Sequence, residues 1–579
     1  MNYSFLKSNT FVFLILVVVV FMVFGNALFN EYSYDDHYLI LDNHYIRDLA
    51  NFKDFLLNDV AIMTPIEKPS GYYRPVSMIF LVLNYKIWGL NAFGLHLTSV
   101  LIHLLNCFLV FLITKQIVKN FWVPFLSSLI FAVHPIHSEA VAPIFNYMGI
   151  LASLFALSSV WTFIKFRLTQ KMKYMILSVL FFLLAVFSKE EAIVLPGIFV
   201  LYDFYFCSEF SVLKVLKRWK QYLFLVSPAI FYIVLRFFVF GKEAAFGFWR
   251  MNMELNIPAS SCLTDQIITT FYIFFKYFLL LLFPVRLSAF YAIKPAISLM
   301  PIEIFLSVYF ILFVVLYATV FAKKKPVISF FISWFFVSSF MISNIVPVGG
   351  LFSERFMYFP SVAYCFFVGL FFYNAMFFLK GQNERQKRLL VILGFLTVFV
   401  LYAQKTTIRN YVWRNDITLW TDTVQKTPES SHPILYLADS YYFYGEAFYD
   451  KALKAYLKAL EYPKAPKARI KNSIGKFYGL QNKHAEALKY FKDALELDPQ
   501  DVKTLYNVGV TYYFLDQYNE AAKYFEKVNF IDKDYPWGYY GLGLVYQKKN
   551  QQSKAREFFE KALELDPSLV NAKIALETL

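Results

Sequence analysis

The stretch NTFVFLILVVVVFMVFGNAL at residues 9–28 contains twenty residues and no charged side chain. An α-helix of about 20 apolar residues is long enough to cross the hydrocarbon core of a bilayer. Ten more apolar runs follow before residue 405, so we predict a bundle of about eleven membrane-spanning helices. The predicted spans are residues 9–28, 95–113, 119–134, 146–165, 174–188, 191–207, 221–240, 303–321, 327–345, 360–379 and 388–404.

The composition of the 579-residue chain agrees with a large membrane domain. Hydrophobic residues make up 58% of it and charged residues 17%, whereas soluble domains average about 45–50% apolar and about 25% charged. These values exclude a disordered chain, which needs low hydrophobicity and high net charge. The 4 cysteines form no Cys-x-x-Cys pair, so neither a disulfide framework nor a cysteine metal site is predicted.

Positive charge is concentrated in short segments between the apolar runs, and the net charge is +15. Cytoplasmic loops of membrane proteins collect Lys and Arg. All the basic segments lie on the cytoplasmic side only if the apolar stretch 266–283 does not cross, so we expect that stretch to be re-entrant or interfacial. The C-terminus is then outside, and no nucleic-acid binding is predicted. The basic positions are Lys7, Lys115, Lys119 and residues 165–173, 214–220, 323–325 and 380–388.

After residue 405 the chain becomes polar and repeats itself every 34 residues. The pattern Gly-x-x-Tyr, Ala-x-x-x-Phe and then Pro is typical of tetratricopeptide repeats (TPR). The recurring positions are Gly475, Gly509 and Gly543; Tyr478, Tyr512 and Tyr546; Ala487, Ala521 and Ala555; and Phe491, Phe525 and Phe559. We predict an all-α chain with a polytopic membrane domain over 1–404, a connecting helical segment over 405–432, and a TPR α-solenoid with a cap helix over 433–579.

The predicted topology gathers the polar motifs on the outer side of the membrane. SYDDHYLILDN follows the first span, and YYRP lies in the same outer loop, residues 30–94. The motifs HPIHSEA, SKEEA and LFSERFMYFPS join later spans on this side. Because they converge at one face, we predict a functional site there. The candidate residues are Asp35, Asp36, Arg74, His134, His137, Glu139, Lys189, Glu190, Glu354 and Arg355.

Each motif also has a structural interpretation. Asp35 and Asp36 can cap a short helix or face solvent in a loop. The histidines and the glutamate of HPIHSEA have the composition of a metal site, but such a cluster is more often a hydrogen-bonded loop, and the metal requirement stays open. Arg74 can be an interfacial anchor. Local ion pairs are the alternative for the remaining charges: Lys189 with Glu190 and Glu191, and Glu354 with Arg355.

The set of residues suits group transfer at the membrane surface. One of two adjacent carboxylates can act as a general base that accepts the proton of an attacking hydroxyl. The leaving group would be a polyprenyl phosphate held in the bilayer, and its oxygens need cations near the interface, such as Arg74, Lys189 or Arg355. A lipid-phosphate donor carries no nucleotide, so neither a Rossmann fold nor a phosphate-binding loop is required.

A series of motifs in this order resembles a known family. The motifs are DDH, YYRPVSMIFLVLNY, FAVHPIHSEAVA, FSKEEAIVLP, SERFMYFPS and YVWRNDITLWTDTVQKTPESS, the last of which leads into the repeats. The ensemble resembles the transmembrane-and-TPR O-mannosyltransferases and their bacterial relatives, which are lipid-sugar-dependent glycosyltransferases of the C fold class. The resemblance covers nearly the whole chain.

The resemblance implies a multi-span enzyme that transfers mannose or another hexose, with inversion, from a polyprenyl- or dolichyl-phosphate donor to a protein hydroxyl. By the same match Asp35 and Asp36 carry catalysis, with Asp35 the first choice, and HPIHSEA lines the same cavity. The pairs Lys189–Glu190 and Glu354–Arg355 match motifs that face the donor phosphate. The TPR array would bind the acceptor protein or a partner through its concave face.

Two other classes of function remain open. A non-catalytic membrane scaffold would use its TPR array to recruit envelope or secretory proteins, and its two aspartates would be replaceable. A transporter or lipid flippase would use polar groups inside the spans, such as His103 and Arg236. The outer segments contain no Asn-x-Ser/Thr sequon, which favours a bacterial inner membrane with a periplasmic array over an endoplasmic-reticulum membrane with a lumenal one.

Overall fold

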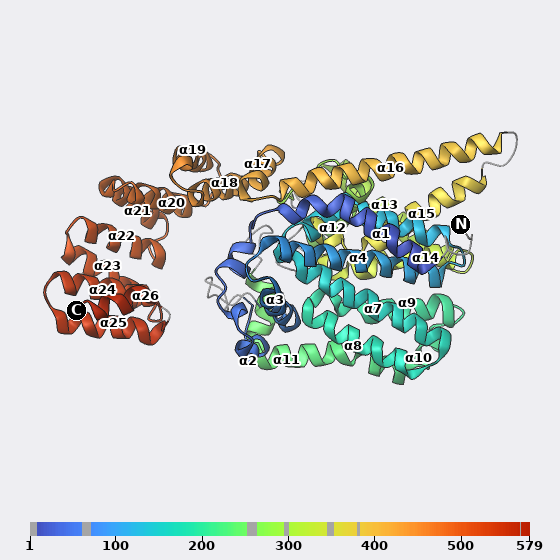
Figure 1. The fold of residues 1–579 in the computed structure, drawn as a ribbon, viewed down its shortest axis with the longest axis horizontal. Helices are drawn as coiled ribbons and strands as arrows, with labels where there is room; N and C mark the ends of the chain where they lie inside the picture. Colours follow the sequence, from blue (N-terminus) through green and yellow to red (C-terminus); the bar gives the residue numbers. More distant parts are fainter. Residues whose placement is uncertain are drawn as a thin grey trace. The chain divides into compact units, whose positions relative to one another are not determined.

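The computed structural model describes residues 8–60, 71–251, 263–293, 300–343, 352–378, 383–567 and 569–579. Every regular element in these residues is a helix, with no β-strand among them, which confirms the predicted all-α fold. The chain divides into two compact units, residues 1–422 and 423–579 (Figure 1). Residue 404, the predicted end of the membrane domain, falls inside the continuous helix α16 (Glu384–Val412).

The first unit is a multi-pass membrane unit built from apolar helices. Within the described residues, seven helices are long and apolar enough to cross a membrane: α1 (Asn9–Phe24), α4 (Ala92–Ile117), α7 (Tyr147–Thr169), α11 (Trp219–Met251), α12 (Leu263–Leu282), α13 (Pro301–Val320) and α16. Shorter apolar helices are α3 (Pro75–Trp88), α5 (Trp122–Val133), α8 (Met172–Ser188), α14 (Pro326–Ser338) and α15 (Ser361–Phe378). The remaining helices of this unit are α2 (Phe52–Leu57), α6 (Ser138–Val141), α9 (Leu195–Tyr202), α10 (Val212–Leu216) and α17 (Asp416–Lys426).

These lengths differ in part from the predicted spans. Six of the predicted spans coincide with helices long enough to cross a membrane, whereas the other five coincide with shorter helices. These five are the segments predicted over 119–134, 174–188, 191–207, 327–345 and 360–379, of which residues 344, 345 and 379 lie outside the described residues. The exact number of crossings stays a prediction.

One end of the first unit gathers the ends of several helices. Asn410 of α16 donates its side-chain amide to the carbonyl of Val23 near the end of α1 (3.1 Å). Thr406 of α16 donates its hydroxyl to the carbonyl of Val133 at the end of α5 (2.6 Å). Figure 1 shows α1 and α16 lying side by side, and the two helices are in contact. We call this the motif end, because the segments that follow α1, α5 and α8 carry the predicted motifs.

Helix α12 packs against segments of the motif end at three points along its length. The Thr270 hydroxyl donates to the carbonyl of Ser343 (2.8 Å), and the Tyr277 hydroxyl donates to that of Ser353 (3.2 Å). The carbonyl of Leu281 lies 3.0 Å from a ring nitrogen of His134. By length and composition α12 could cross a membrane, and the expectation that 266–283 does not cross stays a prediction.

The opposite end of α7 holds a buried carboxylate that the charge pattern did not reveal. Asp203 is fully buried and accepts hydrogen bonds from Arg167 and from the Tyr222 hydroxyl (2.5 Å). Arg218 lies 3.3 Å from the same carboxylate. These contacts tie α7, the turn after α9 and the start of α11 together, in a region where the sequence suggested mainly Lys and Arg.

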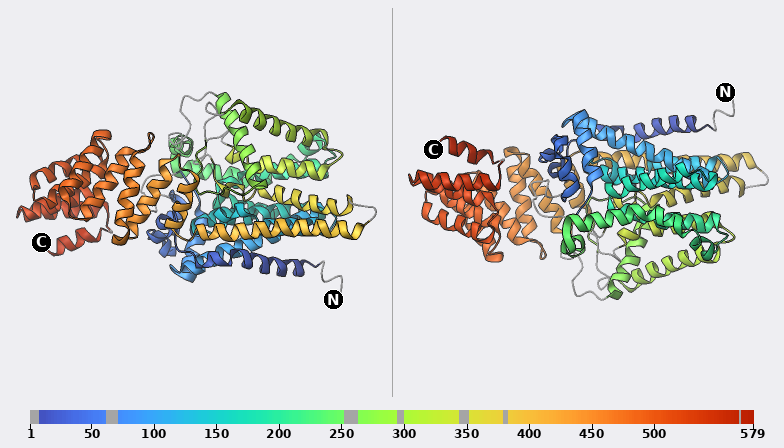
Figure 2. Two further views of the ribbon diagram at one scale, coloured as in Figure 1. Left: turned by 90° about the horizontal axis from the view of Figure 1, so that it is seen from above. Right: turned by 90° about the horizontal axis from the view of Figure 1, so that it is seen from below.

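The second unit stacks helix pairs, shown from two further sides in Figure 2. The pairs are α18 (Ser431–Phe443) with α19 (Tyr449–Leu460), α20 (Lys467–Leu480) with α21 (His484–Leu497), α22 (Val502–Phe514) with α23 (Tyr518–Ile531), and α24 (Pro536–Lys548) with α25 (Gln552–Leu565), followed by α26 (Val570–Glu577). A Cβ at Gly509 would lie 2.6 Å from the ring of Phe525. The repeated glycine therefore lets the two helices of a pair approach closely, as the spacing predicted.

Candidate active site

The Asp35–Asp36 pair lies in a short loop between α1 and a helical turn over His37–Leu41. Tyr34 precedes the pair with a φ of 55°, in the left-handed region that residues with a side chain rarely adopt. Asp36 is fully buried, and its two oxygens accept backbone N–H groups from Ser33 (3.0 Å) and Phe145 (2.6 Å). Asp36 thus fastens the loop to the segment before α7.

Asp35 is the member of the pair whose carboxylate stays available. It is half-buried, and among the described residues no donor is hydrogen-bonded to its carboxylate. Burial raises the pKa of Asp35 to about 6, while the Arg355 guanidinium opposes the rise and the Asp416 carboxylate adds to it. A general base is most effective when its pKa lies near the working pH. Burial also raises the pKa of Asp36 to about 7, but the oxygens of Asp36 are already occupied.

The segment after the last long helix supports this loop. Within YVWRNDITLW, the carbonyl of Arg414 accepts the backbone N–H of Glu31 (2.8 Å). Asp416, the first residue of α17, accepts the backbone N–H of Tyr34 through Oδ1 (2.6 Å). Its Oδ2 atom lies 2.9 Å from Nε2 of His37. In the family resemblance this segment was only the link to the repeats. In the structure it contacts the loop that carries Asp35 and Asp36, so it is part of the site.

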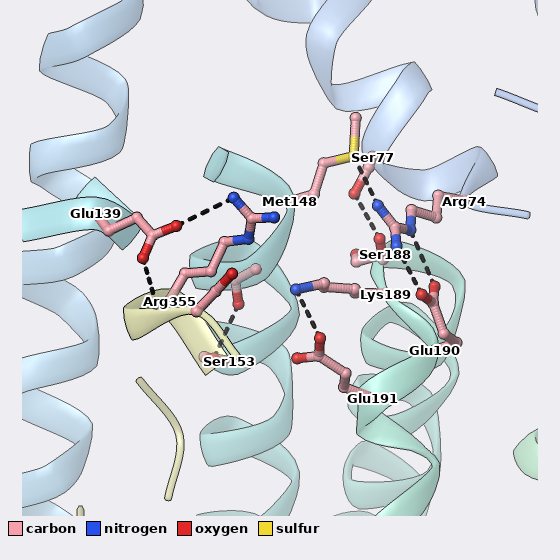
Figure 3. A network of polar contacts seen from close by, with 12 residues as sticks. Arg74, Ser77, Glu139, Met148, Ser153, Ser188, Lys189, Glu190, Glu191 and Arg355 are labelled. Atoms are coloured by element: carbon pink, nitrogen blue, oxygen red, sulfur yellow. Dashed lines mark hydrogen bonds and ion pairs between the residues drawn. The ribbon is translucent and has the colours of Figure 1, made fainter. Parts of the chain in front are cut away.

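Arg74, just before α3, forms a two-point ion pair with Glu190 (Figure 3). Its Nε and Nη2 atoms lie 2.9 and 2.6 Å from the two carboxylate oxygens. Burial alone would raise the pKa of Glu190, but the Arg74 guanidinium outweighs it and lowers this pKa to about 2. Lys189 binds Glu191 instead, at 2.8 Å. The local pair predicted for Lys189 therefore involves Glu191, while Glu190 is held by a residue far along the chain.

Glu354 and Arg355 contact different partners. Arg355 donates from Nη1 and from its backbone N–H to the two oxygens of Glu139, each at 3.1 Å. Glu354 is fully buried and accepts the Tyr291 hydroxyl (2.7 Å) and the backbone N–H of Ser288 (2.5 Å). The alternative of a local Glu354–Arg355 ion pair is wrong, because each side chain contacts residues far along the chain instead.

The histidines of HPIHSEA are buried and engaged with the protein. His134 accepts the backbone N–H of Ile136 (3.2 Å), and its other nitrogen lies 3.0 Å from the Leu281 carbonyl. His137 contacts the Phe131 carbonyl and the Ser361 hydroxyl, each at 2.8 Å. Among the described residues no three His, Cys, Asp or Glu side chains are arranged to hold a metal ion. This geometry supports the hydrogen-bonded-loop interpretation of the motif.

A pocket opens beside the ion pairs. Arg355 and Glu191 line its polar side, and Phe356, Ile342 and the small residues on one face of α7 line its apolar side. A Cβ at Gly149 of α7 would lie 3.6 Å from the Lys189 ammonium. The pocket therefore combines one cation and one carboxylate with apolar and small side chains next to the predicted membrane helices.

Sequence reasoning missed one buried cation. Arg409 of α16 is 2% exposed, its Nη1 atom lies 2.9 Å from Asp422, and its Nη2 atom lies 3.5 Å from Glu354. An arginine shortly after an apolar run is typical of an interfacial anchor. The sequence therefore did not indicate that Arg409 is buried. The partners that bury it come from segments 13 and 55 residues away, which only the fold brings together.

Comparison with known proteins identifies tetratricopeptide repeats in the second unit. Tetratricopeptide repeat families match residues 480–536 and 536–569. The solved structure of MamA matches 29% of this chain and 95% of its own at 20% identity, with a TM-score of 0.25.

Relatives that match most of the chain are named protein O-mannosyl-transferases. Protein O-mannosyl-transferase TMTC3 of Mus musculus is 24% identical over 532 residues, 86% of this chain and 52% of that protein. Protein O-mannosyl-transferase Tmtc3 of Drosophila melanogaster is 23% identical over 575 residues, 87% of this chain and 57% of that protein. The predicted resemblance is confirmed, and the chain spans about half the length of the curated relatives it matches.

Proposed function

We infer that this chain, a relative of the transmembrane-and-TPR protein O-mannosyl-transferases, is a membrane glycosyltransferase that acts on proteins. The donor we propose is a polyprenyl- or dolichyl-phosphate hexose, with mannose as the expected sugar. One observation carries the proposal: at the motif end Asp35 presents an available carboxylate with a raised pKa, and Arg355 lies close enough to influence that pKa.

In the proposed reaction the hydroxyl oxygen of an acceptor side chain attacks the anomeric carbon of the donor sugar. The new bond joins that carbon to the acceptor oxygen, and the bond between the carbon and the phosphate oxygen breaks. The hydroxyl proton passes to the Asp35 carboxylate, and the polyprenyl phosphate leaves with the bonding electron pair. Attack from the side opposite the leaving group inverts the sugar, as expected from the resemblance.

The charges and the pocket support a lipid-phosphate donor. The leaving phosphate gains negative charge, which preorganised cations stabilise. Arg355 is the best-placed group, since 27% of its side chain stays exposed in spite of its ion pair with Glu139. Lys189 lies 5.6 Å from the centre of the Phe356 ring, at the pocket. The proposal assigns no step to a metal ion.

The TPR unit is the part of the chain that we assign to protein recognition. Stacked helix pairs create an extended concave surface, and the proposed occupant is the acceptor protein or a partner that delivers it. We place the reaction on the outer or lumenal side, because the basic loops would then all be cytoplasmic. A bacterial periplasm is favoured over the endoplasmic reticulum, because the outer segments contain no Asn-x-Ser/Thr sequon.

A scaffold and a transporter are the rival functions. A scaffold would have no use for a carboxylate that is partly buried without a hydrogen-bond donor. A transporter would need available polar groups inside the spans. The two candidate side chains, His103 and Arg236, are instead hydrogen-bonded to other parts of the protein. The His103 ring lies 2.7 Å from the Tyr358 hydroxyl, and Arg236 donates to the Gly71 carbonyl (2.8 Å).

The test replaces Asp35 with Asn and measures transfer from synthetic polyprenyl-phosphate mannose to endogenous protein in isolated membranes. Loss of a general base reduces the rate by about 10²–10⁴-fold. Asp42→Asn is the matched control, because it removes an exposed carboxylate from the same loop and should leave transfer unchanged. Transfer by the Asp35→Asn variant at the control rate would exclude the catalytic role, and a wild-type chain without any transfer would exclude the enzyme.

A further inference from the structure

Asp416 is a buried carboxylate that the proposed reaction does not use directly. It is 8% exposed. One of its oxygens accepts the Tyr34 backbone N–H at 2.6 Å, and the other lies 2.9 Å from the His37 ring. These two partners flank Asp35 and Asp36 in the chain, so a single side chain holds the loop on both sides of the proposed base.

The position of Asp416 is itself fixed by the start of α17. Asn415 accepts the backbone N–H of Thr418 through its side chain (3.0 Å), and Thr418 accepts the backbone N–H of Asn415 through its hydroxyl (3.2 Å). This reciprocal arrangement is a helix cap. It determines where the helix begins and therefore where the next side chain, that of Asp416, points. The negative charge of Asp416 is also favoured at a helix N-terminus.

The backbone of Tyr34 needs the support that Asp416 provides. Its left-handed backbone, with a φ of 55°, is unfavourable for a residue with a side chain and persists only where surrounding contacts impose it. The hydrogen bond from its N–H to Asp416 is such a contact, and its ring also packs edge-on against Trp420 of α17 (5.3 Å between centroids). Because Tyr34 directly precedes Asp35, relaxation of its φ would turn the Asp35 carboxylate away.

Several charged groups surround Asp35, and Asp416 is one of them. Asp36 and His37 adjoin it in the chain. Arg355 from η12 (Glu354–Met357) and Tyr72 from the segment before α3 interact with it electrostatically. Arg355 favours the ionised form of Asp35, whereas the negative charge of Asp416 raises the pKa of Asp35 and makes its carboxylate more basic.

We propose that Asp416 is a positioning residue for Asp35: by binding Tyr34 and His37 it holds the catalytic loop around Asp35 in its strained conformation, with a negative charge in the surroundings of Asp35. The inference rests on the proposed function. Under this proposal α17, the helix that leads into the TPR unit, connects the two units and also supports the catalytic loop.

The test compares Asp416→Asn and Asp416→Ala in the full-length chain, using transfer from polyprenyl-phosphate mannose across a range of pH. Asn keeps an oxygen for the Tyr34 N–H but removes the charge. We expect a modest loss of kcat and an acid limb of the pH profile displaced to lower pH, since the pKa of Asp35 falls. Ala removes the hydrogen bonds, and a displaced catalytic group costs on the order of 100-fold in kcat, with the KM for the donor unchanged.

Glu429→Gln is the matched control, because it removes an exposed carboxylate just after α17 and should leave both kcat and the acid limb unaltered. An Asp416→Asn variant with the wild-type acid limb would overturn the proposal, even if Asp416→Ala fails to fold. A loss of transfer accompanied by a raised KM, with no displaced limb, would also overturn it. If the wild type transfers no sugar at all, the proposed function fails first.

Discussion

Replacing Glu190 by Gln is expected to destabilise the membrane unit by about 3 kcal/mol, because it breaks a buried two-point ion pair with Arg74. The two side chains are 11% and 14% exposed, so water does little to compensate the charge that is left behind.

The magnitude follows from the structure in two ways. Removing one partner of a buried ion pair typically costs about 3–5 kcal/mol. Independently, the pKa of Glu190 falls from its ordinary 4.5 to about 2, and each pKa unit corresponds to about 1.4 kcal/mol, which again gives about 3 kcal/mol. Because the pKa is lowered, this stabilisation is present above pH 4.5 and is lost as the pH falls toward 2.

A double-mutant cycle measures the pair directly. Arg74→Gln, Glu190→Gln and the double variant are unfolded in mixed micelles at neutral pH, and the free energy of unfolding is followed by circular dichroism. We expect the double variant to be less destabilised than the sum of the single variants, with a coupling energy of about 3 kcal/mol. The same cycle on the exposed pair Arg388–Glu384 of α16 serves as the control. A coupling energy as small as the control's would refute the reasoning.

Three further predictions concern the pocket, the base and the repeats. With Asp35 as the base and a pKa of about 6, kcat/KM should be constant above that pH and fall with acidity below it, which a pH series of transfer rates will check. Gly149→Leu should raise the KM for the lipid donor severalfold with little change in folding, because its side chain enters the pocket beside Lys189. Gly509→Ala places a Cβ 2.6 Å from the Phe525 ring and should destabilise the TPR unit by about 1–3 kcal/mol, measured by limited proteolysis.

The fold was predictable where local patterns determine it. Long apolar runs specify membrane helices, and a 34-residue step with Gly opposite Phe specifies a TPR pair, because both depend on residues close in sequence. Helix length was less predictable. The apolar run over 119–134 gives a helix of 12 residues, α5, since a run that is buried inside a bundle can end wherever neighbouring segments satisfy its backbone.

The candidate site was predictable in its members but not in its pairings. The motif-bearing loops do meet at one end of the unit, as the topology required. Glu190 and Arg74 are 116 residues apart, and Arg355 and Glu139 are 216 apart. The adjacent charges of Glu354 and Arg355 suggest a local ion pair, but in the structure the two side chains do not pair with each other. Asp416 escaped notice for the same reason: its partners are some 380 residues away.

The place where α17 sits in the chain has a practical consequence for dissecting the protein. The compact units divide after Asp422, so α17 begins in one unit and ends in the other. A truncation at the last apolar run, intended to remove only the repeats, would also delete the carboxylate that binds Tyr34 and His37. Loss of transfer in such a variant would be mistaken for loss of acceptor recognition. A cut after Lys426 spares the catalytic loop, and the contribution of the repeats can then be judged by itself.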